Sequence, residues 1–191
     1  MNKRVAQYPI NNIFLERHSP RAMSGEKLSE HELMSLFEAA RWAPSSYNNQ
    51  PWYFVYALRE TPAWDHFFDL LVSFNQSWTS KGAVLILVVS KNNFAYNDQP
   101  SRTHSFDTGA AVENLALQGL MMGLVVHGME GFDYDKARQV LRIPDDYTVE
   151  AMFVVGKPGS INDLSPELQK REELSDRKRI EEFVFEGTFK K

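Results

Sequence analysis

Residues 105–123 read SFDTGAAVENLALQGLMMG and form the most unusual stretch of the sequence. This composition favours a helix with almost no polar face, and such a helix is buried on all sides. Gly109, Gly119 and Gly123 each cost about 1 kcal/mol in helix propensity, which indicates that another backbone approaches closely there. In a chain of 191 residues a second subunit makes complete burial of this helix easier. We therefore expect a homodimer.

The segments on both sides of this helix alternate between helices and strands. Ser29 and Glu32 have the spacing of a capping box, and the apolar residues behind them predict a helix that ends near Trp42, before Pro44. The run 83–89 is short and apolar on both faces, which predicts a central strand covered on both sides. The other expected elements are strands at 52–57, 124–127 and 150–155, and helices at 63–74 and 134–141.

The composition excludes several classes of protein. With 43% hydrophobic and 24% charged residues and a net charge of −4, the chain has the profile of a globular protein that binds neither nucleic acid nor a membrane. The absence of cysteine excludes disulfides, a thiolate nucleophile and cysteine-bound metal. The histidines show no metal-ligand spacing, and we expect no metal site. No apolar run is long enough to span a membrane and no signal peptide is evident, so we expect a cytoplasmic protein.

The chain is expected to form a single domain over residues 1–191. From Glu167 onward the composition changes to mostly charged residues, followed by the apolar run Phe183-Val184-Phe185. That run has no obvious partner within a closed domain. Residues 167–191 are therefore predicted to be an extension that wraps onto a neighbouring subunit.

Two polar clusters are candidates for a binding site. Arg17-His18-Ser19-Pro20-Arg21 offers guanidinium and hydroxyl donors of the kind that bind anionic oxygens; alternatively, it is an exposed basic loop. The segment 44–52, PSSYNNQPW, places small hydrogen-bonding side chains between two prolines. Such a loop could recognise the edge of a flat heteroaromatic ligand, and the alternative is a plain turn.

These motifs together resemble those of the nitroreductase family of FMN-dependent flavoproteins. The resemblance starts with Arg17-His18-Ser19-x-Arg21 and the 44–52 loop. It continues, in the order of the family, through 107–115 (DTGAAVENL), 129–132 (MEGF), 155–158 (VGKP) and 177–182 (RKRIEE). The resemblance implies an α+β fold of three α/β/α layers. In it, a central mixed, largely antiparallel sheet is flanked by helices and the FMN lies at the interface of an intertwined homodimer.

The resemblance also implies which residues bind FMN. Arg17, Ser19 and Arg21 would hold the phosphate and ribityl chain, His18 would lie along the cofactor, and Arg177 with Lys178 would close on the phosphate. The backbone of Glu130 and Gly131, after Met129, would face the flavin N5 and O4, where donors stabilise developing negative charge. The remaining implied contacts are Asn75 and, from the other subunit, Pro44, Ser45, Ser46, Asn48 and Gln50.

The implied reaction is a ping-pong electron transfer from NADH or NADPH, through flavin N5, to a small acceptor such as a nitroaromatic or a quinone. No protein acid or base is required, because the cofactor carries the chemistry. Three alternatives stay open: the same fold with another reaction (enone reduction, reductive dehalogenation or ring oxidation), a non-catalytic flavin sensor, and a ligand-free dimerisation module. The aromatic residues of 94–104 either cap the pocket or are ordinary loop and helix-cap residues, and we favour the second interpretation.

Overall fold

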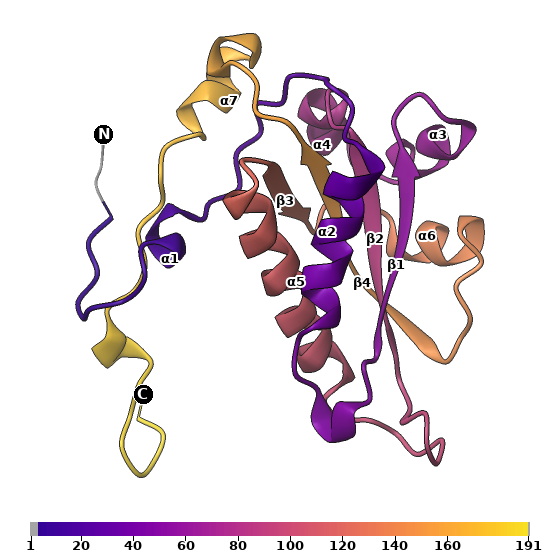
Figure 1. Cartoon of the computed structure of the whole chain (residues 1–191), viewed down its shortest axis with the longest axis vertical. Coiled ribbons are helices and arrows are strands. Elements are labelled where there is room, and N and C mark those ends of the chain that lie inside the picture. Colours follow the sequence, from indigo (N-terminus) through magenta and orange to yellow (C-terminus); the bar gives the residue numbers. More distant parts are fainter. Residues whose placement is uncertain (1–3, 191) are drawn as a thin grey trace.

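The computed structural model describes residues 4–190 and arranges them in three layers, with helices on both faces of a central sheet (Figure 1). The sheet has four strands in the order β1-β2-β4-β3, and each neighbouring pair is antiparallel. The predicted α+β class with a largely antiparallel sheet is confirmed. Residues 1–3 and 191 of the expected domain lie outside the described part of the chain. The elements are α1 (Ile13–Glu16), α2 (Glu30–Arg41), η1 (Ser46–Asn48), β1 (Trp52–Leu58), α3 (Pro62–Phe68), α4 (Ser73–Thr79), β2 (Val84–Lys91), α5 (His104–Met121), β3 (Val125–Met129), α6 (Tyr134–Val140), β4 (Tyr147–Gly156), η2 (Ile161–Asp163), α7 (Pro166–Lys170) and η3 (Ile180–Glu182).

Strand β2 is the centre of the core, as its sequence predicts. Its residues are buried from Val84 to Ser90, and β1 and β4 pair along its two edges. Leu85 and Leu87 face one side of the sheet, while Val84 and Ile86 face the other. This alternation of side chains along a strand buries apolar surface under both helical layers.

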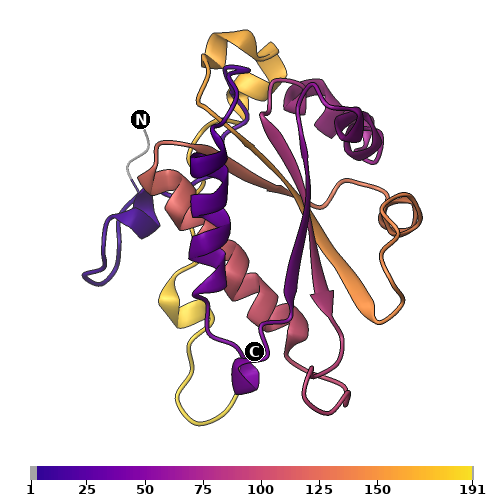
Figure 2. The ribbon, with the colours of Figure 1, turned by 45° about the vertical axis from the view of Figure 1, so that its right-hand side comes forward.

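The two helical layers cover opposite faces of the sheet (Figure 2). Helices α2 and α5 lie on one face, where Leu36 and Leu115 meet Ile86 in a common apolar cluster. Helices α3, α4, α6 and α7 cover the other face, where Phe67 and Trp78 are among the buried residues. Helix α2 begins with the predicted capping box, in which the Ser29 hydroxyl accepts from the amide of Glu32. The predicted helix ending near Trp42 is confirmed.

The single helix expected over 63–74 is wrong, because the chain leaves helical geometry between α3 and α4. Leu71 forms an isolated β-bridge with Phe132, and the amide of Val72 donates to the carbonyl of Gly131 at 3.1 Å. These long-range hydrogen bonds replace the helical ones that local spacing predicts. As a result, Asn75 lies on a separate helix, α4, which faces the turn after β3.

Within residues 4–190 helix α5 is buried on one side only, and the burial of its other side by a second subunit stays a prediction. Ala111 and Leu115 are buried against the sheet and α2, whereas Phe106 and Met121 are 81% and 63% exposed. Of its glycines, Gly119 lies against the side chain of Val126, so its close neighbour is a side chain and not the expected backbone. A Cβ added at Gly109 or Gly123 would have no atom within 4 Å, so nothing approaches these two glycines closely within residues 4–190.

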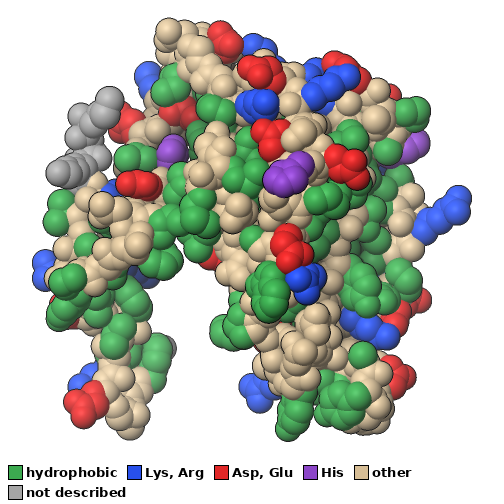
Figure 3. Space-filling view, viewed as in Figure 1, with side chains coloured by type: hydrophobic (Ala, Val, Ile, Leu, Met, Phe, Trp, Pro, Cys, Tyr) green, Lys and Arg blue, Asp and Glu red, His purple; other side chains and the backbone are tan. Residues whose placement is uncertain are grey.

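The two ends of the chain run side by side away from the sheet and form a projecting lobe, the indigo and yellow segments of Figure 1. An open gap separates the lower part of this lobe from the main body (Figure 3). Side chains of the N-terminal arm, such as Gln7, bond to the C-terminal arm at Glu181 and Ile180. Apolar side chains on both arms stay exposed, Val5 at 80% and Phe183 at 59%.

Candidate functional site

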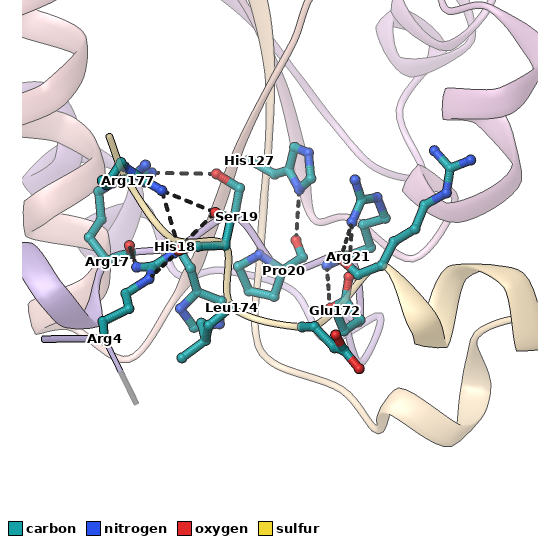
Figure 4. A pocket seen from close by; sticks show the side chains of 13 residues that line it. Arg4, Arg17, His18, Ser19, Pro20, Arg21, His127, Glu172, Leu174 and Arg177 are labelled. Carbon is teal, nitrogen blue, oxygen red and sulfur yellow. Dashed lines mark hydrogen bonds and ion pairs between the residues drawn. The ribbon is translucent and has the colours of Figure 1, made fainter. Parts of the chain in front are cut away.

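A cavity of about 300 Å³ lies where the loop 17–21 meets the C-terminal segment 171–177 (Figure 4). Its volume is at the lower limit of small-molecule sites. Arginines dominate the wall and come from both ends of the chain. The lining residues are Arg4, Arg17, His18, Ser19, Pro20, Arg21, His127, Arg171, Glu172, Glu173, Leu174, Ser175 and Arg177.

Arg21 and Glu172 fix one end of the cavity. Nη1 of Arg21 donates to Oε1 of Glu172 at 3.1 Å and to the carbonyl of Arg171 at 3.2 Å. The backbone amide of Arg21 donates to Oε2 of Glu172 at 2.9 Å. The Glu172 side chain is only 5% exposed, so this pair is a partly buried anchor between the loop and the C-terminal segment.

Arg17 and Arg177 lie at the other end of the cavity. Nε of Arg17 is 3.6 Å from Oε1 of Glu113 on α5, and its Nη1 is 3.4 Å from the hydroxyl of Ser19. Nη1 of Arg177 donates to the hydroxyl of Ser175 at 3.0 Å. Residues from the N-terminal loop, the central helix and the C-terminal segment therefore meet in one place.

The cavity is electrostatically suited to an anion. Burial, and after it the charges of Arg177 and Arg17, lower the pKa of Arg4, because like charges gather in a partly desolvated space. Nε of Arg21 is buried and makes no hydrogen bond within residues 4–190. A phosphate would neutralise the repulsion and offer oxygen acceptors to guanidinium donors.

His127, on β3, forms the back of the cavity. Its Nδ1 lies 2.9 Å from the carbonyl oxygen of Pro20, and since a carbonyl can only accept, Nδ1 carries the hydrogen. Its ring packs against Trp78 with centroids 4.5 Å apart. Burial lowers the pKa of His127, an effect that the Pro20 hydrogen bond opposes and the charge of Arg21 increases. A neutral His127 thus holds the loop 17–21 against the sheet.

The turn Glu130–Gly131 after β3 is held from both sides. The carbonyl of Gly131 accepts from Nδ2 of Asn75 at 2.9 Å and from the amide of Val72, while the carbonyl of Glu130 accepts from Phe132 at 2.9 Å. A Cβ at position 131 would lie 2.7 Å from Nδ2 of Asn75 and 3.0 Å from Cγ2 of Val72, so a side chain there would displace Asn75. Asn75 therefore acts first as the support of this turn.

The polar loop 44–50 lies at the N-terminal end of α5, away from the arginine cavity (Figure 1). The amide of Ser46 donates to Oδ2 of Asp107 at 3.0 Å, and the hydroxyl of Thr103 donates to the same oxygen at 3.1 Å. Tyr47, Asn48 and Gln50 adopt positive φ angles of 53°, 53° and 49°. Such angles are uncommon outside glycine and hold the loop in one defined shape that leaves Tyr47 81% exposed.

Comparison with known proteins assigns the chain to a family. Residues 14–157 match the model of the nitroreductase family. The chain belongs to this family. A solved structure described as an oxidoreductase containing FMN is 39% identical, covers 100% of this chain and 98% of its own, and superimposes with a TM-score of 0.95.

Relatives of this nitroreductase-family protein include protein DrgA of Synechocystis, 28% identical over 73% of this chain and 81% of the relative. Another is an Archaeoglobus fulgidus protein whose name includes NADH dehydrogenase and NAD(P)H nitroreductase. It is 24% identical over 78% of this chain and 84% of its own length. Within residues 4–190 no helix is long and apolar enough to cross a membrane, and no group of three potential metal ligands gathers.

The fold of this nitroreductase-family protein divides the predicted site residues into separate groups. Arg17, His18, Ser19, Arg21 and Arg177 line one cavity. Lys178 instead lines a second groove, between the two terminal arms. The Met129 side chain lies in the apolar core, so only its backbone is available to a ligand. The loop with Pro44, Ser45, Ser46, Asn48 and Gln50 and the turn with Asn75, Glu130 and Gly131 lie outside that cavity lining.

Sequence reasoning did not single out Arg4, Glu172 or His127 as parts of this site. None of them belongs to a motif that points to binding. Glu172 also falls in a run of charges that is typical of a solvated surface. Only contacts across more than a hundred residues bring it to Arg21.

Proposed function

We propose that this protein is an FMN-dependent oxidoreductase in which the arginine cavity holds the phosphate and ribityl chain of FMN. The observation that carries this proposal is the meeting of Arg17, Arg21 and Arg177, with the hydroxyl of Ser19, around a space of about 300 Å³. Five arginines line the cavity, counting Arg4 and Arg171, against two glutamates, and this excess of positive charge is electrostatically unfavourable unless a further anion binds. A dianionic phosphate removes this cost.

The similarity to a structure that contains FMN supports the same cofactor. It extends over the whole length of the chain, including the C-terminal segment that supplies Arg177. The residues also fit the group chemically, because the buried Nε of Arg21 is a donor that still needs an acceptor. Riboflavin, which lacks the phosphate, would leave this donor and the charge repulsion unresolved.

The chain's own part in catalysis is to bind and orient the cofactor. When bound, FMN supplies reversible hydride and electron transfer through its ring system. The turn at Glu130 and Gly131 would present backbone N–H groups to the ring, and Asn75 fixes the direction of that turn. Preorganised donors of this kind stabilise negative charge where it develops.

We further propose that the active unit is a homodimer with FMN at the interface. The exposed side of α5 carries the large apolar residues Phe106 and Met121, which a second copy would cover. The loop 44–50 would then reach the partner's cofactor with Ser45, Ser46 and Asn48. Of the extension 167–191, residues 171–177 pack on the chain's own loop 17–21. Only the end of the extension, whose residues Phe183 and Val184 are exposed, would lie on the other subunit.

The reductant in this proposal is NADH or NADPH, which the name of the Archaeoglobus relative supports. The acceptor is a small planar molecule such as a quinone or a nitroaromatic. An aromatic cluster lies at the loop 44–50, which would face the flavin. Tyr47 of this loop lies 5.8 Å from Phe94 and 6.0 Å from Tyr96, measured between ring centroids. Rings of this kind stack on flat aromatic ligands.

The visible absorbance of the purified protein tests the proposal, before and after anaerobic addition of NADH or NADPH. A flavin band that bleaches with a nucleotide, and returns when a quinone is added, is the expected result. A band that no nucleotide bleaches would favour a non-catalytic flavin sensor. The absence of a band after incubation with FMN would contradict the proposal.

A further inference from the structure

Arg4 joins the two ends of the chain at the arginine cavity. Its Nη1 donates to the carbonyl oxygens of Arg17 at 2.6 Å and Leu15 at 3.0 Å. Its Nε donates to the carbonyl oxygen of Ser175 at 2.9 Å. One planar guanidinium therefore binds three carbonyls on two segments that are distant in sequence. Arginine can do this because its donors form a rigid fork.

The two segments that Arg4 joins carry the cationic side chains of the cavity. Ser175 is adjacent to Arg177 in space, and its hydroxyl accepts from Nη1 of Arg177 at 3.0 Å. On the other segment, Arg17 is followed by Ser19 at the cavity wall. Figure 4 shows Arg4, Arg17 and Arg177 gathered at one end of the cavity. Fixing both backbones fixes the separation of Arg17 and Arg177.

The hydrogen bonds of Arg4 indicate positioning and not direct binding of an anion. Nη1 and Nε are already used by carbonyl oxygens, and Nη2 lies 3.5 Å from the hydroxyl of Ser175. Burial, and after it repulsion by the charges of Arg177 and Arg17, lowers the pKa of Arg4. The carbonyl contacts oppose this repulsion, so they can hold the cations close together before an anion arrives.

We propose that Arg4 is a positioning residue that clamps the segment 174–177 onto the loop 17–21 and thereby preforms the phosphate site. At the opposite end of the cavity, Glu172 joins the same two segments through Arg21. The cavity is thus closed by one clamp at each end. The inference rests on the proposed FMN function for the identity of the ligand, although the clamp itself does not.

Binding of FMN and of riboflavin to the flavin-free full-length protein tests the clamp, with flavin fluorescence as the measurement. Arg4→Ala should weaken FMN binding by roughly tenfold, because charge-assisted hydrogen bonds that order the site are lost. Riboflavin binding should change by less than about twofold, since it has no phosphate to lose. Arg4→Lys should not restore FMN binding, because an ammonium has no fork. Arg41→Ala, on the surface of α2, is the matched control.

Trypsin cleavage without any flavin gives a second, independent measurement. Loss of the clamp should speed cleavage after Arg177, Lys178 and Arg179 in Arg4→Ala, while Arg41→Ala should be cleaved like the wild type. Thermal unfolding followed by circular dichroism establishes that both variants are folded. If Arg4→Ala fails to fold, the same comparison is made on Arg4→Lys.

Two results would overturn the inference. One is an Arg4→Ala protein that binds FMN and resists trypsin like the wild type. The other is an equal loss of FMN and riboflavin binding, which would indicate general loosening and not a preformed phosphate site. If the wild type binds neither flavin, the proposed function fails, and the cleavage rates still decide whether Arg4 clamps the two segments.

Discussion

The arginine cavity and the polar loop 44–50 are built in opposite ways. The cavity is cationic and is assembled from both ends of the chain, which the ion pair of Arg21 and Glu172 holds together. The loop is neutral and local, and a single side chain, Asp107, holds it to α5. The cavity is complete within one chain, whereas the loop presents its side chains outward. Under the proposed function, the phosphate of the cofactor would be held by one subunit, and its ring would be enclosed by the loop of the second.

The largest effect should come from removing the second subunit. The double variant Leu117→Asp and Leu120→Asp changes two residues on the partly exposed side of α5. It would bury two charges in the proposed interface and destabilise the dimer by several kcal/mol for each charge. We expect a monomer by light scattering and a large loss of FMN affinity, because the loop 44–50 of the other copy is absent. Met34→Asp, on an exposed position of α2, should stay dimeric. A dimeric double variant would disprove the assigned interface.

A direct comparison of the two regions is possible with single alanine variants. Arg17→Ala should weaken FMN binding by about 1.5–3 kcal/mol, or roughly 10- to 100-fold, because it removes a charge-assisted contact. Ser46→Ala in the loop should cost only about 0.5–1.5 kcal/mol, since that contact is neutral. Titration with FMN at two salt concentrations measures both, and only the Arg17 effect should shrink at high salt. Equal effects would contradict the division of roles.

Asp107→Asn should make the loop 44–50 more mobile and leave the arginine cavity unchanged. The carboxylate of Asp107 accepts from Ser46 and Thr103, and the amide of asparagine accepts more weakly, so stability should fall by about 1 kcal/mol. Hydrogen exchange should quicken at the Ser46 amide and stay unchanged at Arg21. Asp135→Asn, on the exposed surface of α6, is the control. An unchanged exchange rate at the Ser46 amide would show that Asp107 does not hold the loop in place.

The smallest expected effect is a pH dependence at the back of the cavity. Burial lowers the pKa of His127 in the folded protein, so the unfolded chain takes up its proton first as the pH falls below about 6.5. This contribution to stability is present above that pH and is lost as the pH falls through the folded-state pKa. The slope should be a fraction of the about 1.4 kcal/mol per pH unit that one full proton gives.

His127→Asn can still donate to the carbonyl of Pro20 but does not titrate. Chemical unfolding at pH 5, 6 and 7 in the absence of FMN should therefore give a flatter profile for the variant than for the wild type. A variant that loses as much stability as the wild type over this range would show that His127 is not the titrating group.

Patterns in neighbouring residues correctly predicted the helices and strands that depend on contacts between neighbouring residues. The capping box at Ser29 and Glu32 began a helix as expected, and the doubly apolar run 83–89 became the central strand. The helix expected over 63–74 was wrong because Leu71 bonds to Phe132, a partner that helical spacing does not reveal. The burial of the other side of α5 stays a prediction, since that side has no partner within residues 4–190.

The sequence by itself determined the central strand and the two polar clusters, because periodicity, capping and donor chemistry depend on neighbouring residues. It also carried the motifs whose resemblance to a family implied the α+β class. Only the tertiary structure decided that Arg4, Glu172 and His127 join Arg17 and Arg21 around one cavity. The same holds for the separation of the polar loop from that cavity. Hydrogen bonds between residues 150 or more positions apart depend on how the whole chain packs, and no local pattern encodes them.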